Sequence, residues 1–395
     1  MTADLMNSDF RLFKIEIDKN EYPTHDNMPI TGHIKIELKK PLIIKAIKIQ
    51  FKGRALHREN GNESEKAYVD NDFNLLDRIP GQPVPASFPW NANFLYSLPF
   101  NFIFPAMCPT SYESPQGYIR YWLRCTVVLD DAQKTEYMIK KGLNVVAWRA
   151  TSSADHPSNS ISASETISFG TCCCRGKLSA EVQLPKSNYS PGEVVYGSLK
   201  INNRHPRHMI ELVDVKLVDS LTRANSPFAY PGRTLVHQKL DLNNLKPKGV
   251  TQKDDIAFIK IPAVAPTTIQ GSSDSMMTGL FFSSYINEES NNVGTMHSNS
   301  FAFRKQPFLQ IHYEIQVVIS GKLELRLPIT IAALQTQGSR IVYKPFVGGP
   351  QNIIERDEMD KKRLNNFEFT PYYPYLNEIT STIGGIGSDG INSSS

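Results

Sequence analysis

The chain lacks long apolar runs and has few cysteines, which argues against a membrane-spanning protein and against a small disulfide-stabilised secreted domain. Of its 395 residues, no 18 in a row are apolar, and the opening residues, Met1 to Asp4, lead into polar sequence. We therefore expect neither a membrane-spanning helix nor a secretory signal, and a cytoplasmic location. The five cysteines, Cys108, Cys125 and the triplet 172–174, do not form the spaced framework of an even number of cysteines that stabilises small secreted domains.

An excess of one charge is also lacking, as are the motifs of cofactor sites and active sites. Lys and Arg number 43 against 39 Asp and Glu, and a net charge of +4 does not indicate a nucleic-acid partner. The sequence contains no Walker loop, no Gly-x-Ser-x-Gly elbow and no His-Glu-x-x-His motif. Residues 385–390 spell a dinucleotide fingerprint, but they follow no strand and open no helix. We expect no catalytic activity, no cofactor and no metal.

What the sequence does contain is alternation. Apolar residues recur with a period of two at 119–129, 47–51 and 311–319. This pattern is typical of β-strands with one face in the core and the other exposed to water. No amphipathic helix longer than about three turns is evident. The expected fold class is all-β, with antiparallel sandwiches of immunoglobulin-like type.

The two halves of the chain resemble each other. Tyr22 and Gly32 in the first half recur, within similar neighbouring residues, as Tyr189 and Gly197 in the second. The offset is 167 residues at the tyrosines and 165 at the glycines. A nearly constant offset predicts one module present twice, and each copy has the size of a single domain.

Composition suggests the boundaries of these modules. We expect an N-terminal sandwich at 8–165, a second sandwich at 172–345 and an extension at 346–395 whose end is disordered. The stretch 151–171 is rich in Ser and Thr and is expected to be a connecting loop. Long loops are expected at 57–96, because of its prolines, and at 270–306, because of its Ser and Asn.

Several ordered motifs resemble those of a known family. Residues 98–105 read Leu-Pro-Phe-Asn-Phe-Ile-Phe-Pro, 109–113 read Pro-Thr-Ser-Tyr-Glu, and 117–123 read Gly-Tyr-Ile-Arg-Tyr-Trp-Leu. They resemble the signature of the arrestin N-domain. Residues 189–193, Tyr-Ser-Pro-Gly-Glu, followed by Asn-Asn-Arg at 202–204, resemble the opening of the arrestin C-domain. The chain is thus similar to the arrestin family, in particular its α-arrestin, or arrestin domain-containing, branch. This resemblance implies two tandem arrestin-type sandwiches.

The physical chemistry of one motif agrees with this fold independently. Pro99 and Pro105 flank a short stretch in which Phe100, Phe102 and Phe104 share one phase. Proline cannot donate a ladder hydrogen bond and so marks strand ends or edges. We expect the three phenylalanines to pack in the core.

The resemblance implies a non-enzymatic adaptor. Such a protein binds cytoplasmic tails or loops of membrane proteins, directs their sorting, endocytosis or ubiquitin-dependent trafficking, and acts in the cytoplasm or peripherally at the plasma membrane or endosomes. Its α-arrestin relatives recruit ubiquitin ligases through Pro-Pro-x-Tyr, a motif that this chain lacks. The nearest feature, Pro-Tyr-Tyr-Pro-Tyr at 371–375, is expected to close the fold or lie on its surface. The alternatives are an arrestin-fold coat subunit of retromer type and a β-sandwich enzyme that uses Cys125 or a histidine.

A basic segment is the candidate binding site. Residues 34–58 carry eight Lys or Arg against one Glu, and Lys48 and Lys52 fall on the polar phase of their strand. The candidate cargo or anion ligands are Lys48, Lys52, Arg54 and Arg58. A positive patch of this kind attracts phosphorylated tails, acidic sorting sequences or anionic lipid. The alternative is a solvated edge that resists aggregation.

The cysteine triplet Cys172, Cys173 and Cys174 adjoins Arg175 and Lys177 at the expected domain junction. Three consecutive cysteines are poorly spaced to surround one metal ion. S-acylation beside basic residues would place the protein on a membrane. The alternative is a run of free thiols at the entry to a strand.

Overall fold

Nearly all the described chain is β-strand, as the alternation predicts. The computed structural model describes residues 9–19, 21–23, 28–78, 88–105, 108–147, 159–169, 176–205, 207–223, 232–268, 308–334, 341–347, 351–354 and 366–377. Within these ranges there is no α-helix, and hence no helix long and apolar enough to cross a bilayer. The prediction of an all-β, sandwich-type fold is confirmed. The loop expected at 270–306 lies outside the described residues.

The N-terminal sandwich consists of two sheets. One has the strand order β1-β3-β7, and the other has the order β2-β10-β9-β4-β5, with β6 paired to β4 and β8 to β9. The strands are β1 (Phe10–Ile17), β2 (Glu21–Pro23), β3 (Pro29–Leu38), β4 (Leu42–Glu59), β5 (Asn62–Asn74), β6 (Phe88–Trp90), β7 (Leu95–Ile103), β8 (Tyr112–Ser114), β9 (Gly117–Leu129) and β10 (Glu136–Val146). A short 3₁₀ turn, η2 (Leu75–Arg78), follows β5.

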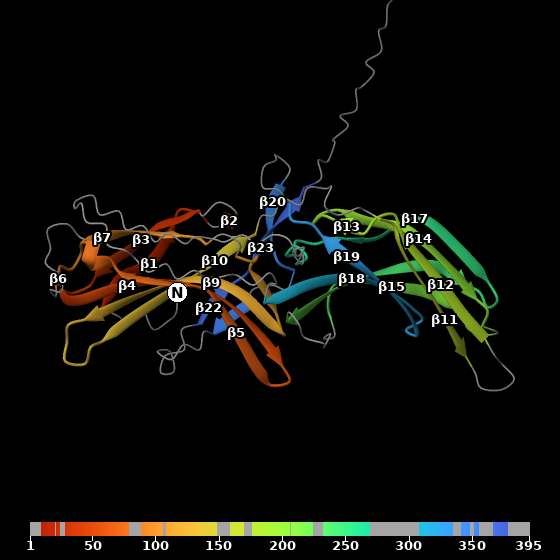
Figure 1. Cartoon of the computed structure of the whole chain (residues 1–395), viewed down its shortest axis with the longest axis horizontal. Coiled ribbons are helices and arrows are strands. Elements are labelled where there is room, and N and C mark those ends of the chain that lie inside the picture. The colour runs from red at the N-terminus through yellow and green to blue at the C-terminus, as the bar shows by residue number, and fades with distance from the viewer. Residues whose placement is uncertain are drawn as a thin grey trace, which may run out of the picture.

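The second sandwich has the same plan. Its sheets have the orders β11-β12-β14-β17 and β13-β19-β18-β15-β16. The strands are β11 (Ile161–Phe169), β12 (Gly176–Leu184), β13 (Asn188–Tyr189), β14 (Val194–Asn203), β15 (Ile210–Arg223), β16 (Arg233–Leu245), β17 (Val250–Lys260), β18 (Leu309–Ile319) and β19 (Leu323–Ile331). Figure 1 shows the two sandwiches end to end, with the N-terminal one on the left.

Strand pairing confirms the internal repeat. The short strand β2 pairs in parallel with β10, and its counterpart β13 pairs in parallel with β19, whereas the other strand pairs are antiparallel. Tyr22 lies in β2 and Tyr189 in β13, the two positions matched in the sequence. Gly32 and Gly197 are likewise equivalent. Gly32 lies in β3, an interior strand of the sheet β1-β3-β7, and Gly197 lies in β14, an interior strand of the sheet β11-β12-β14-β17.

Apolar residues of both sheets meet inside each sandwich. Phe100, Phe102 and Phe104 are at most 5% exposed, as expected for packing residues. The rings of Phe102 and Phe104 lie 5.6 and 5.4 Å from that of Phe51 on the opposite sheet. Burial of one such side chain contributes about 2–3 kcal/mol before conformational entropy is subtracted.

The C-terminal segment forms two further strand pairs. They are β20 (Ile341–Pro345) with β23 (Tyr372–Leu376), and β21 (Gln351–Ile354) with β22 (Asn366–Phe369). Figure 1 shows β20 and β23 between the two sandwiches. Tyr373 and Tyr375 are buried and Tyr372 is 43% exposed, which agrees with the expectation that residues 371–375 close the fold or lie on its surface. Residues 378–395, which include the expected disordered end, lie outside the described ranges.

The prediction of a long loop at 57–96 is wrong for most of that range. Strand β4 continues to Glu59, and the chain turns back at Asn60 and Gly61 into β5. Both turn residues have positive φ, 49° and 81°. Asn-Gly is a strong signal for a tight hairpin. The loop was predicted from the prolines of 80–85, which are not among the described residues, and this hairpin signal was not used.

The connecting loop expected at 151–171 is also wrong in part. Residues 161–169 form β11, which pairs along its whole length with β12. The side chains that face the core are Ile161, Ala163, Ile167 and Phe169. The other face carries Ser and Thr, so the sequence of this strand resembles that of a polar loop. The domain limits 8–165 and 172–345 stay a prediction.

Candidate functional site

The two sandwiches meet at a buried carboxylate. Asp219 lies in β15 of the second sandwich, and its side chain is only 2% exposed. The Tyr112 hydroxyl, from β8 of the N-terminal sandwich, donates a hydrogen bond of 2.7 Å to its Oδ2. Arg233, at the start of β16, donates to the same oxygen at 2.6 Å and to Oδ1 at 3.2 Å. We call these residues and the contacts around them the junction.

Arg233 connects three parts of the chain. Besides its bonds to Asp219, its Nη2 donates to the main-chain oxygen of Glu113 at 3.1 Å. Its guanidinium carbon lies 4.9 Å from the ring centre of Phe346, which follows β20. A planar guanidinium has several donors in fixed directions, so one side chain satisfies two acceptors while its face packs on an aromatic ring.

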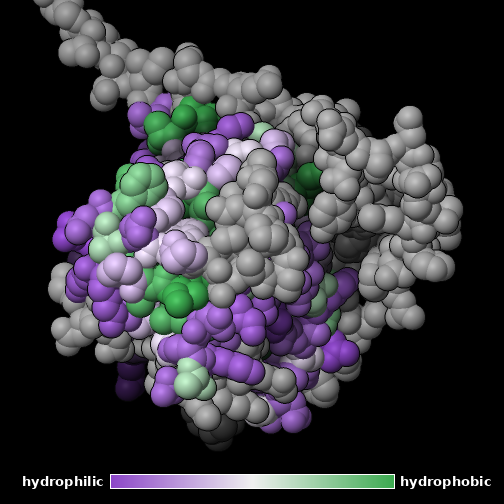
Figure 2. Space-filling view, turned by 90° about the vertical axis from the view of Figure 1, so that its left-hand side faces the viewer, coloured by the Kyte–Doolittle hydropathy of each residue, from purple (hydrophilic) through white to green (hydrophobic). Residues whose placement is uncertain are grey.

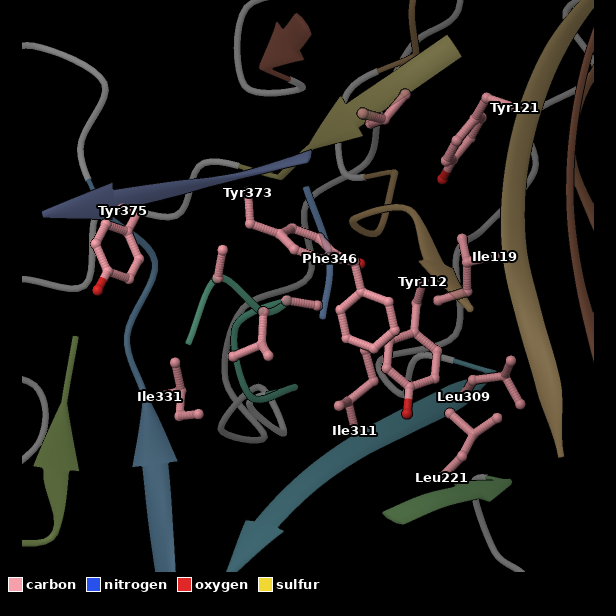
Figure 3. Packing of buried hydrophobic residues seen from close by; sticks show 14 of the residues in the cluster. Tyr112, Ile119, Tyr121, Leu221, Leu309, Ile311, Ile331, Phe346, Tyr373 and Tyr375 are labelled. Carbon is pink, nitrogen blue, oxygen red and sulfur yellow. The ribbon is translucent and has the colours of Figure 1, made fainter. Parts of the chain in front are cut away.

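The C-terminal strand β23 completes the junction. The Tyr373 hydroxyl donates to the Ser111 carbonyl at 2.7 Å, and the Phe346 and Tyr373 rings are 5.9 Å apart. Asn144 of β10 exchanges two hydrogen bonds with the main chain of Tyr372, at 2.8 and 3.0 Å. In Figure 3, Tyr112, Phe346 and Tyr373 gather above Leu309 and Ile311 of β18. The C-terminal segment is therefore bonded to the N-terminal sandwich at the point where the second sandwich joins it.

A second buried ion pair lies on the N-terminal side. Arg120 donates to both carboxylate oxygens of Glu113, at 2.5 and 2.8 Å, and the Glu113 side chain is 2% exposed. Burial raises the pKa of Glu113, and the bonds from Arg120 oppose that rise. Such two-point contacts fix both groups in position, so β8 is held rigidly where it supports Tyr112.

The pKa values of three junction side chains, Tyr112, Arg233 and Tyr373, are raised. Burial, followed by the nearby Asp219 charge, raises the pKa of Tyr112 well above its usual value. Burial alone would lower the pKa of Arg233, but its hydrogen bonds to Asp219 produce a net rise, so it stays charged. Burial also raises the pKa of Tyr373. These groups are suited to holding two domains in one arrangement rather than to proton transfer.

The four predicted cations, Lys48, Lys52, Arg54 and Arg58, all lie on β4. Strand β5, predicted as loop, runs beside them and carries carboxylates. Arg54 pairs with Glu65 at 2.8 Å, and Arg58 pairs with Glu63 at 3.0 Å. The positive charge of this segment is therefore largely balanced by its neighbouring strand. An anion site there stays a prediction, with Lys48 and Arg58 its exposed members.

The outer face of this sheet is not the water-exposed surface that the alternation suggested. Lys52, Trp122 and Arg124 are only 3–5% exposed. Arg124 donates to Gln50 at 2.6 Å, and the Arg54 guanidinium lies 6.0 Å from the Trp122 ring. Strand β22 of the C-terminal segment packs against β10 of the same sheet. The sheet is therefore buried on both faces at these three positions, which a two-residue period does not reveal.

The candidate acylation site Cys172, Cys173 and Cys174 lies outside the described residues. The nearest described residues on either side, Phe169 and Gly176, are paired to each other where β11 ends and β12 begins. The start of β12 pairs with the end of β14, Leu178 with Asn203. The turn after Asn203 leads to the start of β15, whereas the junction residue Asp219 lies near the end of β15. Phe169 and Gly176 therefore lie at the end of the second sandwich opposite the junction. The expected location at the domain junction is therefore wrong for the residues that flank the triplet.

Of the residues considered for an alternative enzyme, Cys125 or a histidine, the cysteine is buried. Cys125 is fully buried, and burial raises the pKa of its thiol far above the usual value. A reactive cysteine needs a thiolate at neutral pH, so Cys125 is unsuited to be a nucleophile. Among the described residues, no group of three His, Cys, Asp or Glu side chains is placed to hold a metal ion.

Asp219 is the functional residue that sequence reasoning missed. It continues the buried phase of Val213, Val215 and Leu217, so an acidic residue on an apolar phase was the available signal. A carboxylate at such a position needs a cationic partner. Its partner Arg233 lies beyond residues 224–231 and shares no motif with it, so the pairing itself was not readable.

Two tandem sandwiches of matching topology, joined through a buried ion pair, define a two-domain scaffold of arrestin type. Comparison with known proteins agrees. The family model "Arrestin (or S-antigen), C-terminal domain" matches residues 174–336, which covers the second sandwich from β12. The second sandwich is thus similar to the arrestin C-terminal domain, and the chain is similar to arrestin domain-containing proteins.

Three curated relatives show the extent of this similarity. Arrestin domain-containing protein 17 of Caenorhabditis elegans is 24% identical over 64% of this chain and 62% of that protein. Arrestin domain-containing protein 5 of Bos taurus is 22% identical over 44% of this chain and 54% of that protein. Arrestin domain-containing protein 15 of Caenorhabditis elegans is 20% identical over 80% of this chain and 77% of that protein. The first two matches thus span less than two thirds of the relative's length.

Proposed function

We propose that this protein is a non-enzymatic adaptor. It binds cytoplasmic tails or loops of membrane proteins and directs their sorting, endocytosis or ubiquitin-dependent trafficking, in the cytoplasm or peripherally at the plasma membrane or endosomes. The observation that carries the proposal is the junction, where hydrogen bonds among Tyr112, Asp219 and Arg233 hold the two sandwiches in a fixed arrangement. An adaptor needs such rigidity because its two sandwiches must present binding surfaces together.

The similarity to arrestin domain-containing proteins supports the same proposal. The partners follow from it: membrane-protein cytoplasmic regions first, and coat or ubiquitin-ligase machinery second. The chain has no Pro-Pro-x-Tyr motif, so a ligase would be recruited through another surface of the sandwiches or through a bridging protein.

Proximity labelling with the full chain in cells tests this proposal. We expect membrane proteins among the enriched species, and we expect purified chain to capture their cytoplasmic segments but not their luminal segments, which serve as the matched control. Constant recovery with a fixed set of coat proteins would favour the coat-subunit alternative. Enrichment of soluble proteins alone would contradict the adaptor assignment.

A further inference from the structure

One edge of the N-terminal sandwich has no described strand beside it and no charged side chain. Strand β7 is the last strand of the sheet β1-β3-β7, and no strand of the described chain pairs with its outer edge. Residues 79–112, which contain β6 and β7, include no Asp, Glu, Lys, Arg or His. The other long edge strands of the two sandwiches, β1, β5, β11, β16 and β17, each carry charged residues. Charge on an edge strand opposes pairing with another chain, so β7 lacks a protection that the other edges have.

The main chain of β7 presents donors and acceptors at this edge. The Phe104 N–H, directly after the strand, donates to the Met28 oxygen on the β3 side at 2.9 Å, and the β3–β7 ladder has no bulge. Because main-chain groups of successive residues point to opposite sides of a strand, the odd-numbered residues of β7 point theirs away from β3. Those with an N–H are Leu95, Ser97, Asn101 and Ile103. Pro99 offers only its oxygen, which is why proline is tolerated there.

The turn η2 leaves these main-chain groups without partners in the described chain. It packs beside β7 but forms no hydrogen bond with it among the described residues. Its Leu75 and Leu76 are at most 2% exposed and fill the gap between the two sheets at this side. The hydrophobic core is therefore closed here, and a further strand on β7 would add to the sheet without being needed to complete the core.

The outward side chains of β7 are uncharged and exposed. Leu95 and Ile103, at the two ends of the strand, are each 50% exposed, and Phe94 just before it is 57% exposed. Also exposed on this face are Ser97, Pro99 and Asn101. Figure 2, which views the N-terminal sandwich end on, shows apolar side chains at the surface among hydrophilic ones. Exposed apolar groups beside an open strand edge mark a surface suited to contact with another strand.

The sequence of β7 is complementary to a second copy of itself. When two copies pair antiparallel with Pro99 opposite Pro99, Leu95 of one lies opposite Ile103 of the other, and Ser97 lies opposite Asn101. Apolar residues then meet apolar residues, and polar residues meet polar ones. The two prolines share the one position that lacks hydrogen bonds, so every other outward residue both donates and accepts a bond. A shift of this register by two residues in either direction shortens the ladder.

We propose that β7 is a self-association edge, at which two copies of the chain pair so that their N-terminal sandwiches share one continuous sheet. An extended peptide also adds to a strand edge in many complexes, but an edge without charge has no means to select an acidic or a basic peptide, whereas a second β7 satisfies the pairing described above. The contact uses the same surface on both copies, so it closes at the dimer. A single strand pair is a small interface, which makes the dimer reversible. This inference does not depend on the proposed function, because it concerns association of the chain with itself.

Sedimentation velocity of the full chain over a range of concentrations tests the proposal. The variant Ser97→Lys/Asn101→Lys places lysine opposite lysine across the paired strands, because residue 97 of one copy faces residue 101 of the other. The variant Ser97→Glu/Asn101→Glu places glutamate opposite glutamate. Like charges directly opposite each other destabilise a strand pair, and opposite charges stabilise it. An equal mixture of the two variants therefore restores the pairing.

A matched control makes the same charge change in the second sandwich. Ser162 of β11 and Gln183 of β12 are exposed and lie opposite each other within one chain. The control variant Ser162→Lys/Gln183→Lys thus adds two facing lysines to an exposed sheet surface away from β7. Unfolding temperatures close to wild type ensure that all variants are folded.

We expect the wild-type chain to pass from monomer to dimer at concentrations up to about 100 μM, since small specific interfaces have dissociation constants in the micromolar range. Each charged β7 variant raises the dissociation constant of the dimer about tenfold or more. Their mixture recovers the dimer, and the control variant dimerises like wild type. A wild-type chain that stays monomeric overturns the proposal, whether or not the edge then binds a peptide of another protein. Equal weakening in the control, full dimerisation of the charged β7 variants or a monomeric mixture overturns it too.

Discussion

Replacement of the junction carboxylate by its amide, Asp219→Asn, tests the central energetic claim. The change keeps the shape of the side chain but removes the charge that accepts bonds from Tyr112 and from two nitrogens of Arg233. Removing one partner of a fully buried ion pair costs about 3–5 kcal/mol. Because the Arg233 side chain is 21% exposed, water compensates part of this, and we expect a loss of about 2–4 kcal/mol.

The same strand supplies a matched control. Asp214 lies five positions earlier on β15 and pairs with His237 at 2.8 Å, but both side chains are more than 30% exposed. Exposed pairs contribute about 0–1 kcal/mol, so Asp214→Asn is expected to change stability little. Urea unfolding followed by tryptophan fluorescence gives both values, provided that one transition describes each variant. If Asp219→Asn is no more destabilising than Asp214→Asn, the junction is not a buried electrostatic contact and the reasoning is refuted.

A second substitution isolates the bond between the sandwiches. Tyr112→Phe removes a hydroxyl that bonds across the junction, and Tyr121→Phe removes one that bonds to Pro109 within the N-terminal sandwich at 2.8 Å. In a double-mutant cycle with Asp219→Asn, only Tyr112→Phe should show a coupling energy, of about 0.5–3 kcal/mol. Equal coupling for both tyrosines would mean that the cycle reports general destabilisation.

Three further predictions concern other parts of the chain. Glu16 contacts Lys14 of β1 and Lys35 of β3, and these two lysines, Lys14 first, lower its pKa to about 2. The stability that this group contributes is therefore present above pH 4.5 and is lost as the pH falls toward 2. Glu16→Gln should make the free energy of unfolding depend less on pH over that range. The backbone at Gly192 has φ +95°, and an added Cβ would lie 2.5 Å from the Leu376 oxygen, so Gly192→Ala should loosen β23 and speed its proteolysis without cleavage elsewhere. Acyl exchange should label the wild-type chain and lose the label when residues 172–174 become serine; a persistent label would place the acyl group on another cysteine.

Much of the fold could be predicted because strands with one buried face, such as 119–129 and 311–319, have apolar residues at every second position. The duplication was readable because equivalent residues such as Tyr22 and Tyr189 serve the same purpose in each copy, a short strand paired in parallel. Strand β11 was missed because half of its residues are Ser, Thr or Glu, which resemble those of a loop.

The candidate site was harder to predict because it depends on contacts between distant residues. Tyr112 and Asp219 are 107 residues apart, and neither has an unusual local sequence. The charges on β4 are balanced by glutamates of β5, and which residues pair depends on the register of the two strands. Because β5 was predicted to be a loop, these glutamates were not expected to lie beside the cations of β4. Where charges lie along a chain is readable, but which of them meet is a property of the fold.

The position of β23 at the end of the chain affects how the protein is made. A ribosome releases both sandwiches before residues 372–376 emerge, and domains generally fold as units during synthesis, the first before the second. We therefore expect a nascent chain whose sandwiches first meet through Tyr112 and Asp219, and whose arrangement becomes fixed only when Tyr372 reaches Asn144 and Tyr373 reaches Ser111. Strand β23 thus makes its contacts last, and a chain that stops before residue 372 would contain both sandwiches without the bonds to Asn144 and Ser111 that fix their arrangement.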